Sequence, residues 1–91
     1  MRITVRIYGD MARILGRNHE IEIPESATVA TLMNRLAEKT GQHQGYLGEF
    51  KIGGNDLAII LNGRNVETLR GTGSSLKDGD EIVIMRPTAG G

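Results

Sequence analysis

The sequence predicts an α+β domain in which one main helix packs across a mixed sheet of four or five strands. Two observations support this prediction: several short segments in which apolar and polar residues alternate, and one longer segment with helical periodicity. Strands bury every second residue and helices every third or fourth, so each kind of element presents an apolar face that the other can cover. A chain of 91 residues has room for one such domain, which we expect to span residues 1–86.

Two strands are expected near the start of the chain. Residues 2–8 alternate between β-branched and polar side chains, and residues 19–23 do so again before Pro24 ends the pattern. The spacing between the two segments suits an antiparallel pair. The side chains expected to point into the core are Ile3, Val5, Ile7, Ile21 and Ile23.

Two segments carry the signals of helices. In the shorter one, which contains Met11, Ile14 and Leu15, Asp10 can cap the start and Gly16 can close the end in the left-handed conformation. The longer one spans about residues 29–40, between Thr28 as N-cap and Gly41 as a left-handed C-terminal residue. Its apolar face comprises Val29, Leu32, Met33 and Leu36, with Ala37 and Thr40 at the margin.

The chain returns to strands after a glycine-rich stretch. Residues 41–56 contain five glycines and are expected to form a long irregular loop. Residues 57–61 form a strand, and Asn62-Gly63 follows, which is the strongest hairpin signal in the chain. A short return strand is expected near residues 65–66.

The last part of the chain predicts one more strand and a tail. Residues 71–75 are expected to form a flexible loop, and Asp78-Gly79 a tight turn before the final strand at residues 82–85. We interpret the carboxylates around this turn as solvated groups rather than as a cation site. Residues 87–91 remain as a tail, since proline has no N–H group to continue a ladder.

The composition excludes several classes of function. There is no cysteine for a disulfide, a zinc site or a thiol nucleophile, and His19 and His43 are interpreted as solvent-facing or loop residues. Eleven basic residues balance eleven acidic ones, and only three aromatic side chains are present, so we expect no nucleic-acid partner. Since no apolar run approaches a membrane span and no signal segment is found, we expect a cytoplasmic protein without a membrane partner.

The chain ends in Gly90-Gly91, which is the candidate site for chemistry. Two glycines can pass through a channel that is too narrow for any Cβ atom. A terminal Gly91 carboxylate would also be the least hindered acyl group that a protein can present. Such an end suits insertion into the active site of another enzyme, whereas the alternative is an ordinary frayed terminus.

An exposed apolar patch is expected beside the start of this tail. If the isoleucines of the last strand face the core, Val83 and Met85 face outward, and Ile60 does so on a second strand. An apolar patch on a small domain usually marks a partner site, although scattered surface aliphatics are the alternative. The predicted partner-binding residues are Ile60, Val83, Met85, Arg86 and Pro87.

Five motifs, taken together and in order, resemble the ubiquitin-like β-grasp sulfur carriers. The likeness is greatest to the small subunit of molybdopterin synthase (MoaD-like). The motifs are YGDMARILG at 8–16, IPESATVATLMNRLAEKTG at 23–41, ILNGRNV at 60–66, LKDGDEIVIMRP at 76–87 and the closing AGG. The sequence departs from the family in its glycine-rich loop at 41–56 and in Arg86-Pro87-Thr88, where the family often has two prolines.

The resemblance implies a ubiquitin-like β-grasp fold and a cycle of sulfur transfer. A MoeB-like adenylating enzyme, similar to ubiquitin-activating enzymes, would use ATP and Mg to convert the Gly91 carboxylate to an acyl-adenylate. A sulfurtransferase would then supply the sulfur of a Gly91 thiocarboxylate. A MoaE-like large subunit would use that sulfur to build the dithiolene of the molybdenum or tungsten cofactor. The chain itself would bind no cofactor or metal and would have no catalytic activity alone; Gly90 would give access to Gly91.

Other fates of an activated Gly91 stay open. A ubiquitin-like protein modifier would transfer it to lysine side chains of target proteins, and a carrier for tRNA thiolation would pass on its sulfur. A thiamine-type sulfur donor (ThiS-like) would share the activation step, although such carriers are usually shorter. An alternative of a different class is a non-catalytic β-grasp interaction domain.

Overall fold

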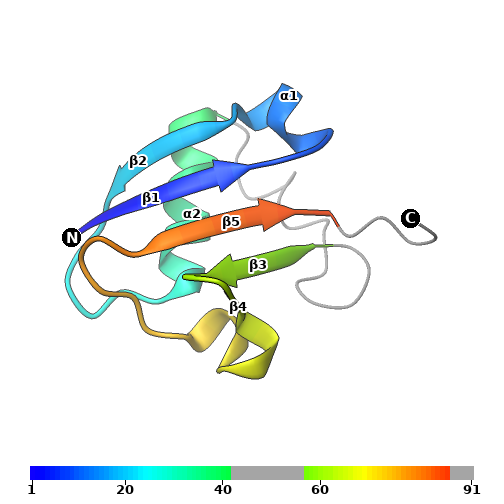
Figure 1. The fold of residues 1–91 in the computed structure, drawn as a ribbon. Helices are drawn as coiled ribbons and strands as arrows, with labels where there is room; N and C mark the ends of the chain where they lie inside the picture. The colour runs from blue at the N-terminus through cyan, green and yellow to red at the C-terminus, as the bar shows by residue number, and fades with distance from the viewer. Residues whose placement is uncertain (42–56, 87–91) are drawn as a thin grey trace.

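One mixed sheet of five strands, with a helix across one face, is formed by residues 1–41 and 57–86, which the computed structural model describes (Figure 1). The strand order is β2-β1-β5-β3-β4. The long helix α2 covers the inner face, and the short helix α1 joins the first two strands. The bounds are β1 Arg2–Ile7, α1 Met11–Leu15, β2 Asn18–Glu22, α2 Val29–Thr40, β3 Ala58–Leu61, β4 Arg64–Asn65 and β5 Glu81–Met85.

The two central strands come from opposite ends of the described chain and run parallel. β1 pairs with β5 from Thr4↔Glu81 to Ile7↔Ile84. β2 lies antiparallel on the other side of β1, as predicted, and β3 lies antiparallel on the other side of β5. The parallel pair makes β1 and β5 end at the same edge of the sheet, which is the edge from which the chain leaves β5 towards its last residues (Figure 1).

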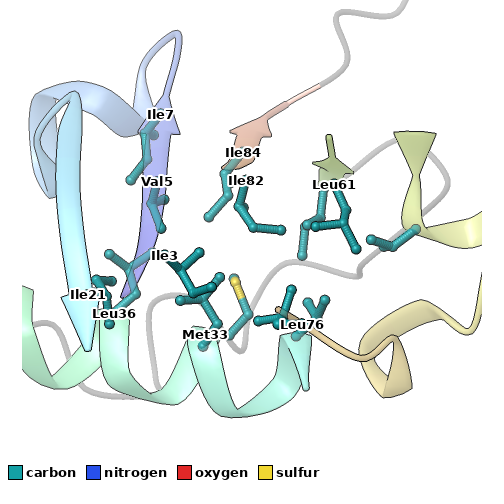
Figure 2. Close-up of a cluster of buried hydrophobic side chains, with 14 of the residues drawn as sticks. Ile3, Val5, Ile7, Ile21, Met33, Leu36, Leu61, Leu76, Ile82 and Ile84 are labelled. Atoms are coloured by element: carbon teal, nitrogen blue, oxygen red, sulfur yellow. The ribbon is translucent and has the colours of Figure 1, made fainter. Parts of the chain in front are cut away.

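Side chains of the inner face and of α2 form the core (Figure 2). The alternation that predicts the strands is reproduced, because Ile3, Val5 and Ile7 are buried between exposed or half-buried neighbours. Transfer of such side chains from water stabilises the fold by about 1.5–3 kcal/mol each. The labelled side chains that meet between the sheet and α2 are Ile3, Val5, Ile7, Ile21, Met33, Leu36, Leu61, Leu76, Ile82 and Ile84.

The ends of α2 are as predicted. Thr28 is extended, and its N–H donates to Thr31 Oγ1 at 3.4 Å, which satisfies a backbone group that the helix leaves unpaired. Gly41 ends the helix in the left-handed conformation with φ 73°, and its N–H donates to the carbonyl of Glu38.

The ends of α1 differ from the prediction. The backbone of Asp10 is already helical, with φ −61° and ψ −32°, and its side chain forms no capping hydrogen bond. Gly16 has a positive φ of 93°, but its ψ of 157° is extended rather than left-handed helical. The chain must turn directly into β2 here, because the Ile7 N–H donates to the Arg17 carbonyl at 2.8 Å.

The Asn62-Gly63 turn is confirmed as a two-residue hairpin. Both residues have positive φ, 47° and 88°, as a type I′ turn requires, and the turn joins the pair Leu61↔Arg64. The return strand β4 is only two residues long, because the chain enters a 3₁₀ turn at Val66.

The prediction of a flexible loop at residues 71–75 is wrong. Residues 71–75 contain the 3₁₀ turn η2 Gly71–Gly73 and the buried Ser74, and another 3₁₀ turn, η1 Val66–Thr68, precedes them. The Ser74 carbonyl accepts from the Val29 N–H at 3.0 Å, so the segment is tied to the start of α2. The loop predicted at 41–56 and the tail at 87–91 lie, beyond Gly41, outside the described residues.

Candidate functional site

The outer face of the sheet carries an apolar strip over β3 and β5. Ile60 pairs directly with Val83 in the antiparallel ladder, and Ala58 pairs with Met85. Ile60 and Val83 are half-buried, whereas Met85 is 38 % exposed. The structure therefore brings the three predicted patch residues together on one face, because Ile59, Ile82 and Ile84 occupy the core face.

Tyr8 extends this strip, and sequence reasoning did not identify it. Its N–H donates to the Ile84 carbonyl at 3.1 Å, so the chain continues alongside β5 after β1 has ended. Since Ile7 is buried, alternation places Tyr8 on the outer side, and its side chain is 52 % exposed. The parallel pairing of β1 with β5 brings the backbone of Tyr8 to Ile84, the residue before Met85, and no local pattern in the sequence predicts that pairing. We define Tyr8, Ile60, Val83 and Met85 as the apolar strip.

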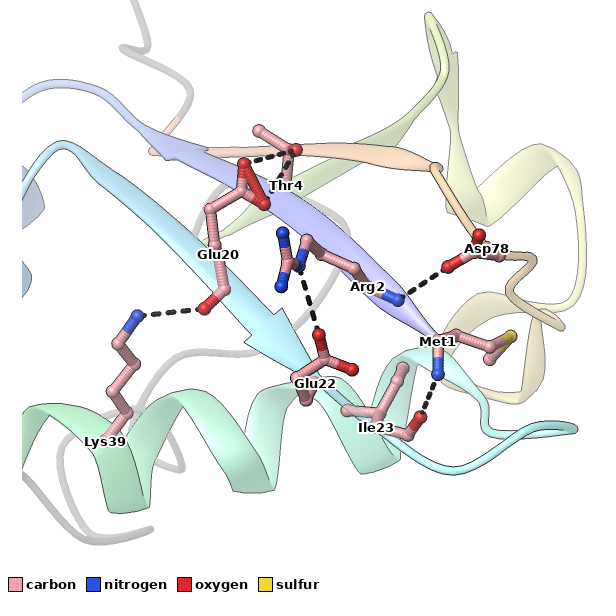
Figure 3. A network of polar contacts seen from close by, with 8 residues as sticks. All are labelled: Met1, Arg2, Thr4, Glu20, Glu22, Ile23, Lys39 and Asp78. Carbon is pink, nitrogen blue, oxygen red and sulfur yellow. Dashed lines mark hydrogen bonds and ion pairs between the residues drawn. The ribbon is translucent and has the colours of Figure 1, made fainter.

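The other half of the outer face, over β1 and β2, is polar, and Figure 3 shows Arg2 paired with Glu22 and the Thr4 hydroxyl bonded to the Glu20 carboxylate. Arg2 Nε lies 3.0 Å from Glu22 Oε1, and Arg6 Nε lies 3.3 Å from Glu81 Oε2. Exposed ion pairs of this kind contribute little stability. The ion pairs mark the boundary between the polar half of the face and the apolar strip. Arg6 stands beside Val83 in the register but directs its charge to Glu81.

The carboxylates near the Asp78-Gly79 turn serve the fold. Asp78 Oδ1 accepts from the Arg2 N–H at 2.8 Å. Asp80 accepts from Asn62 Nδ2 at 2.8 Å and from the Lys77 N–H at 2.7 Å. No group of three or more potential metal ligands occurs among the residues that the structure describes.

The structure tests the prediction for His19 but not the prediction for His43. His19 lies in β2 and is half-buried, so the prediction of a solvent-facing or loop residue is wrong for it. Its ring lies against Gly16, and its Nε2 is buried without a hydrogen-bond partner. His43 lies outside the described residues.

The chain leaves β5 immediately after Met85, which is the last residue of the apolar strip. Arg86 is exposed, whereas Pro87, Gly90 and Gly91 lie outside the described residues. The arrangement thus places an exposed apolar surface next to the point from which the last residues depart. In the described ranges no helix is long and apolar enough to cross a membrane.

A family model matches most of the chain. The model of the ThiS family covers residues 5–91. The chain belongs to the ThiS family. This membership confirms the resemblance to small ubiquitin-like β-grasp sulfur carriers, and no curated protein sequence matches the chain.

The chain is also similar to several solved structures. A putative molybdopterin converting factor subunit 1 from Pyrococcus furiosus is 28 % identical, over 97 % of this chain and 99 % of that one, with a TM-score of 0.76. A chain from the complex of subunits 1 and 2 of the molybdopterin-converting factor of Helicobacter pylori is 30 % identical over 100 % of both chains, with a TM-score of 0.64. SAMP1 from Haloferax volcanii has a TM-score of 0.77 over 100 % of both chains, but at 20 % identity it shares the fold alone.

Proposed function

We propose that this sulfur carrier is the small subunit of a molybdopterin synthase, and that its terminal Gly91 carries sulfur as a thiocarboxylate. The observation that carries the proposal is the 30 % identity, over the full length of both chains, to a chain of the molybdopterin-converting factor complex. The relative from Pyrococcus furiosus, at 28 % identity, also carries the name of a molybdopterin converting factor subunit 1. The match to the ThiS family also extends to Gly91 itself.

The chemistry assigns this chain the role of a substrate. A carboxylate is a poor electrophile because its leaving group would be oxide. A MoeB-like enzyme with ATP and Mg would convert the Gly91 carboxylate to an acyl-adenylate with release of pyrophosphate. The outer sulfur of a persulfide on a sulfurtransferase would then displace AMP and form an acyl disulfide with Gly91. A second thiol would cleave that S–S bond, which releases the Gly91 thiocarboxylate and leaves a disulfide on the sulfurtransferase side. The sulfur would remain covalently held at the end of the chain until a MoaE-like large subunit accepts it.

The apolar strip supports a docking role in this cycle. An enzyme that acts on Gly91 must hold the domain while Gly90 and Gly91 enter its active site. The strip lies at the end of β5 that leads to these residues, and Arg86 follows it directly. We propose that Tyr8, Ile60, Val83 and Met85 contact the adenylating enzyme and the large subunit in turn, with Arg86 and Pro87 at the entrance. One shared surface would prevent both enzymes from binding at once.

A protein modifier or a carrier for tRNA thiolation would use the same activated Gly91. The likeness to SAMP1 concerns the fold, since the identity is 20 %. The two relatives named as molybdopterin converting factors are more similar in sequence, and this difference favours the cofactor route.

Reconstitution tests the route. The thiocarboxylated chain is mixed with the MoaE-like large subunit and the pterin precursor, and dithiolene formation and the intact mass of the chain are followed. We expect dithiolene to form while the chain loses about 16 Da, as oxygen replaces sulfur. Gly-Gly remnants on lysines of cellular proteins, together with no dithiolene, would instead establish the modifier role.

A further inference from the structure

A second surface lies away from the tail, between the β3–β4 hairpin and the segment that contains η1 and η2. Two adjoining hollows of about 440 and 270 Å³ share Leu61, Leu69 and Ser75 in their walls. We define these two hollows as the Leu69 groove. β3 runs antiparallel to β5, so the hairpin lies near the start of β5, whereas the tail leaves from its end (Figure 1).

The floor of the Leu69 groove is apolar. Leu61 is buried, whereas Leu69, which directly follows the 3₁₀ turn η1, is 38 % exposed. Its own N–H donates to the Val66 carbonyl at 2.9 Å, and the Arg70 N–H donates to Ser74 Oγ at 3.0 Å. These bonds hold Leu69 at the surface before any partner arrives, which reduces the entropy that binding would cost.

The rim of the Leu69 groove is cationic. Arg70 lines one hollow, and Arg64 and Lys77 line the other. Within residues 1–41 and 57–86, none of these three side chains forms a hydrogen bond or ion pair. Asp80 is the carboxylate that the described walls contain, and both of its oxygens already accept hydrogen bonds. A chain with no net charge therefore places three cationic side chains and one carboxylate around an exposed leucine.

We propose that the Leu69 groove binds a short acidic peptide segment of a partner protein, in which carboxylates flank one bulky aliphatic side chain. The aliphatic side chain would pack on Leu61 and Leu69, and the carboxylates would pair with Arg64, Arg70 and Lys77. A nucleic acid fits less well, because neither hollow is lined by an aromatic side chain on which a base could stack. Because the groove lies near the start of β5 and the chain leaves β5 at its other end, a partner bound in the groove leaves that exit open. The inference is independent of the proposed sulfur chemistry.

The test is an NMR titration of the full chain, labelled with ¹⁵N, with a synthetic acetylated peptide that has one leucine between aspartates and glutamates. We expect amide shifts to cluster at Leu61, Leu69, Arg70 and Ser75. The same peptide with serine for leucine, or with lysines for the carboxylates, is expected to bind at least about tenfold more weakly. A rise in salt from low to high ionic strength is expected to weaken binding.

Matched variants assign the contacts. Leu69→Ser is expected to weaken peptide binding about fivefold or more, whereas Ile14→Ser, which changes an exposed aliphatic residue on α1, leaves it unchanged. Arg64→Glu is expected to weaken binding, whereas Arg35→Glu on α2 does not. All four positions are exposed, so ¹⁵N spectra can verify that each variant is folded. The proposal is overturned if millimolar peptide shifts no groove amide, or if a single-stranded oligonucleotide binds the groove more tightly than the peptide.

Discussion

Ile60 and Val83 stand opposite each other in the β3–β5 ladder, and both point away from the core. Their neighbours Ile59 and Ile84 form the next pair of the same ladder and are fully buried. One ladder thus separates two tasks, because one pair stabilises the fold and the adjacent pair offers an apolar surface to a partner.

Val83→Asp is predicted to disrupt docking while the domain stays folded. A charge in the centre of the apolar strip must be desolvated on binding, so affinity for the adenylating enzyme and for the large subunit should fall at least about tenfold. Calorimetry or surface plasmon resonance measures this loss. Ala30→Asp, on the exposed side of α2, is the control and should bind normally. Normal binding by the Val83 variant would remove the strip from the interface.

Ile59→Ala and Ile60→Ala are predicted to differ in their effect on stability. Ile59 is completely buried, and its truncation should lower the free energy of unfolding by about 2–5 kcal/mol. Ile60 is half-buried on the outer face, and its truncation should cost about 1 kcal/mol or less. Urea denaturation followed by circular dichroism compares the two. A larger loss for Ile60→Ala than for Ile59→Ala would mean that the register of β3 is shifted by one residue.

Gly63→Ala is predicted to destabilise the hairpin through backbone conformation alone. Gly63 has φ 88°, and a Cβ atom added there would meet nothing within 4 Å, so the cost should be about 1–2 kcal/mol. Gly73→Ala also enters open space, but without a positive φ, and should be neutral or slightly stabilising. Thermal unfolding of the two variants gives the comparison. A loss at both positions would point to a contact that the backbone argument does not include.

Much of the fold could be predicted from local sequence patterns. The alternation of Ile3, Val5 and Ile7 gives the inner face of β1, and Thr28 and Gly41 mark the ends of α2. These signals depend on backbone chemistry and on periodicity within a few residues. The same logic predicted that Ile60, Val83 and Met85 would share the outer face.

Features that depend on distant contacts could not be predicted in this way. The parallel pairing of β1 with β5 brings Tyr8 to the apolar strip, and nothing near Tyr8 in the sequence indicates it. Ser74 lies in a polar, glycine-rich stretch that is typical of a loop, yet it is buried because its carbonyl binds the start of α2. Gly16 likewise has the positive φ that glycine permits, but the entry into β2 determines its ψ.

The central claim is that Gly91 is the group that reacts, and intact-mass spectrometry tests it most directly. The chain is incubated with its adenylating enzyme, Mg-ATP and a persulfide source, in parallel with a variant that lacks Gly91 and with Gly73→Ala as control. We predict a gain of about 16 Da for the chain and the control, and none for the deletion variant, whose melting curve stays unchanged. A gain in the variant without Gly91, or none in the intact chain, would contradict the account.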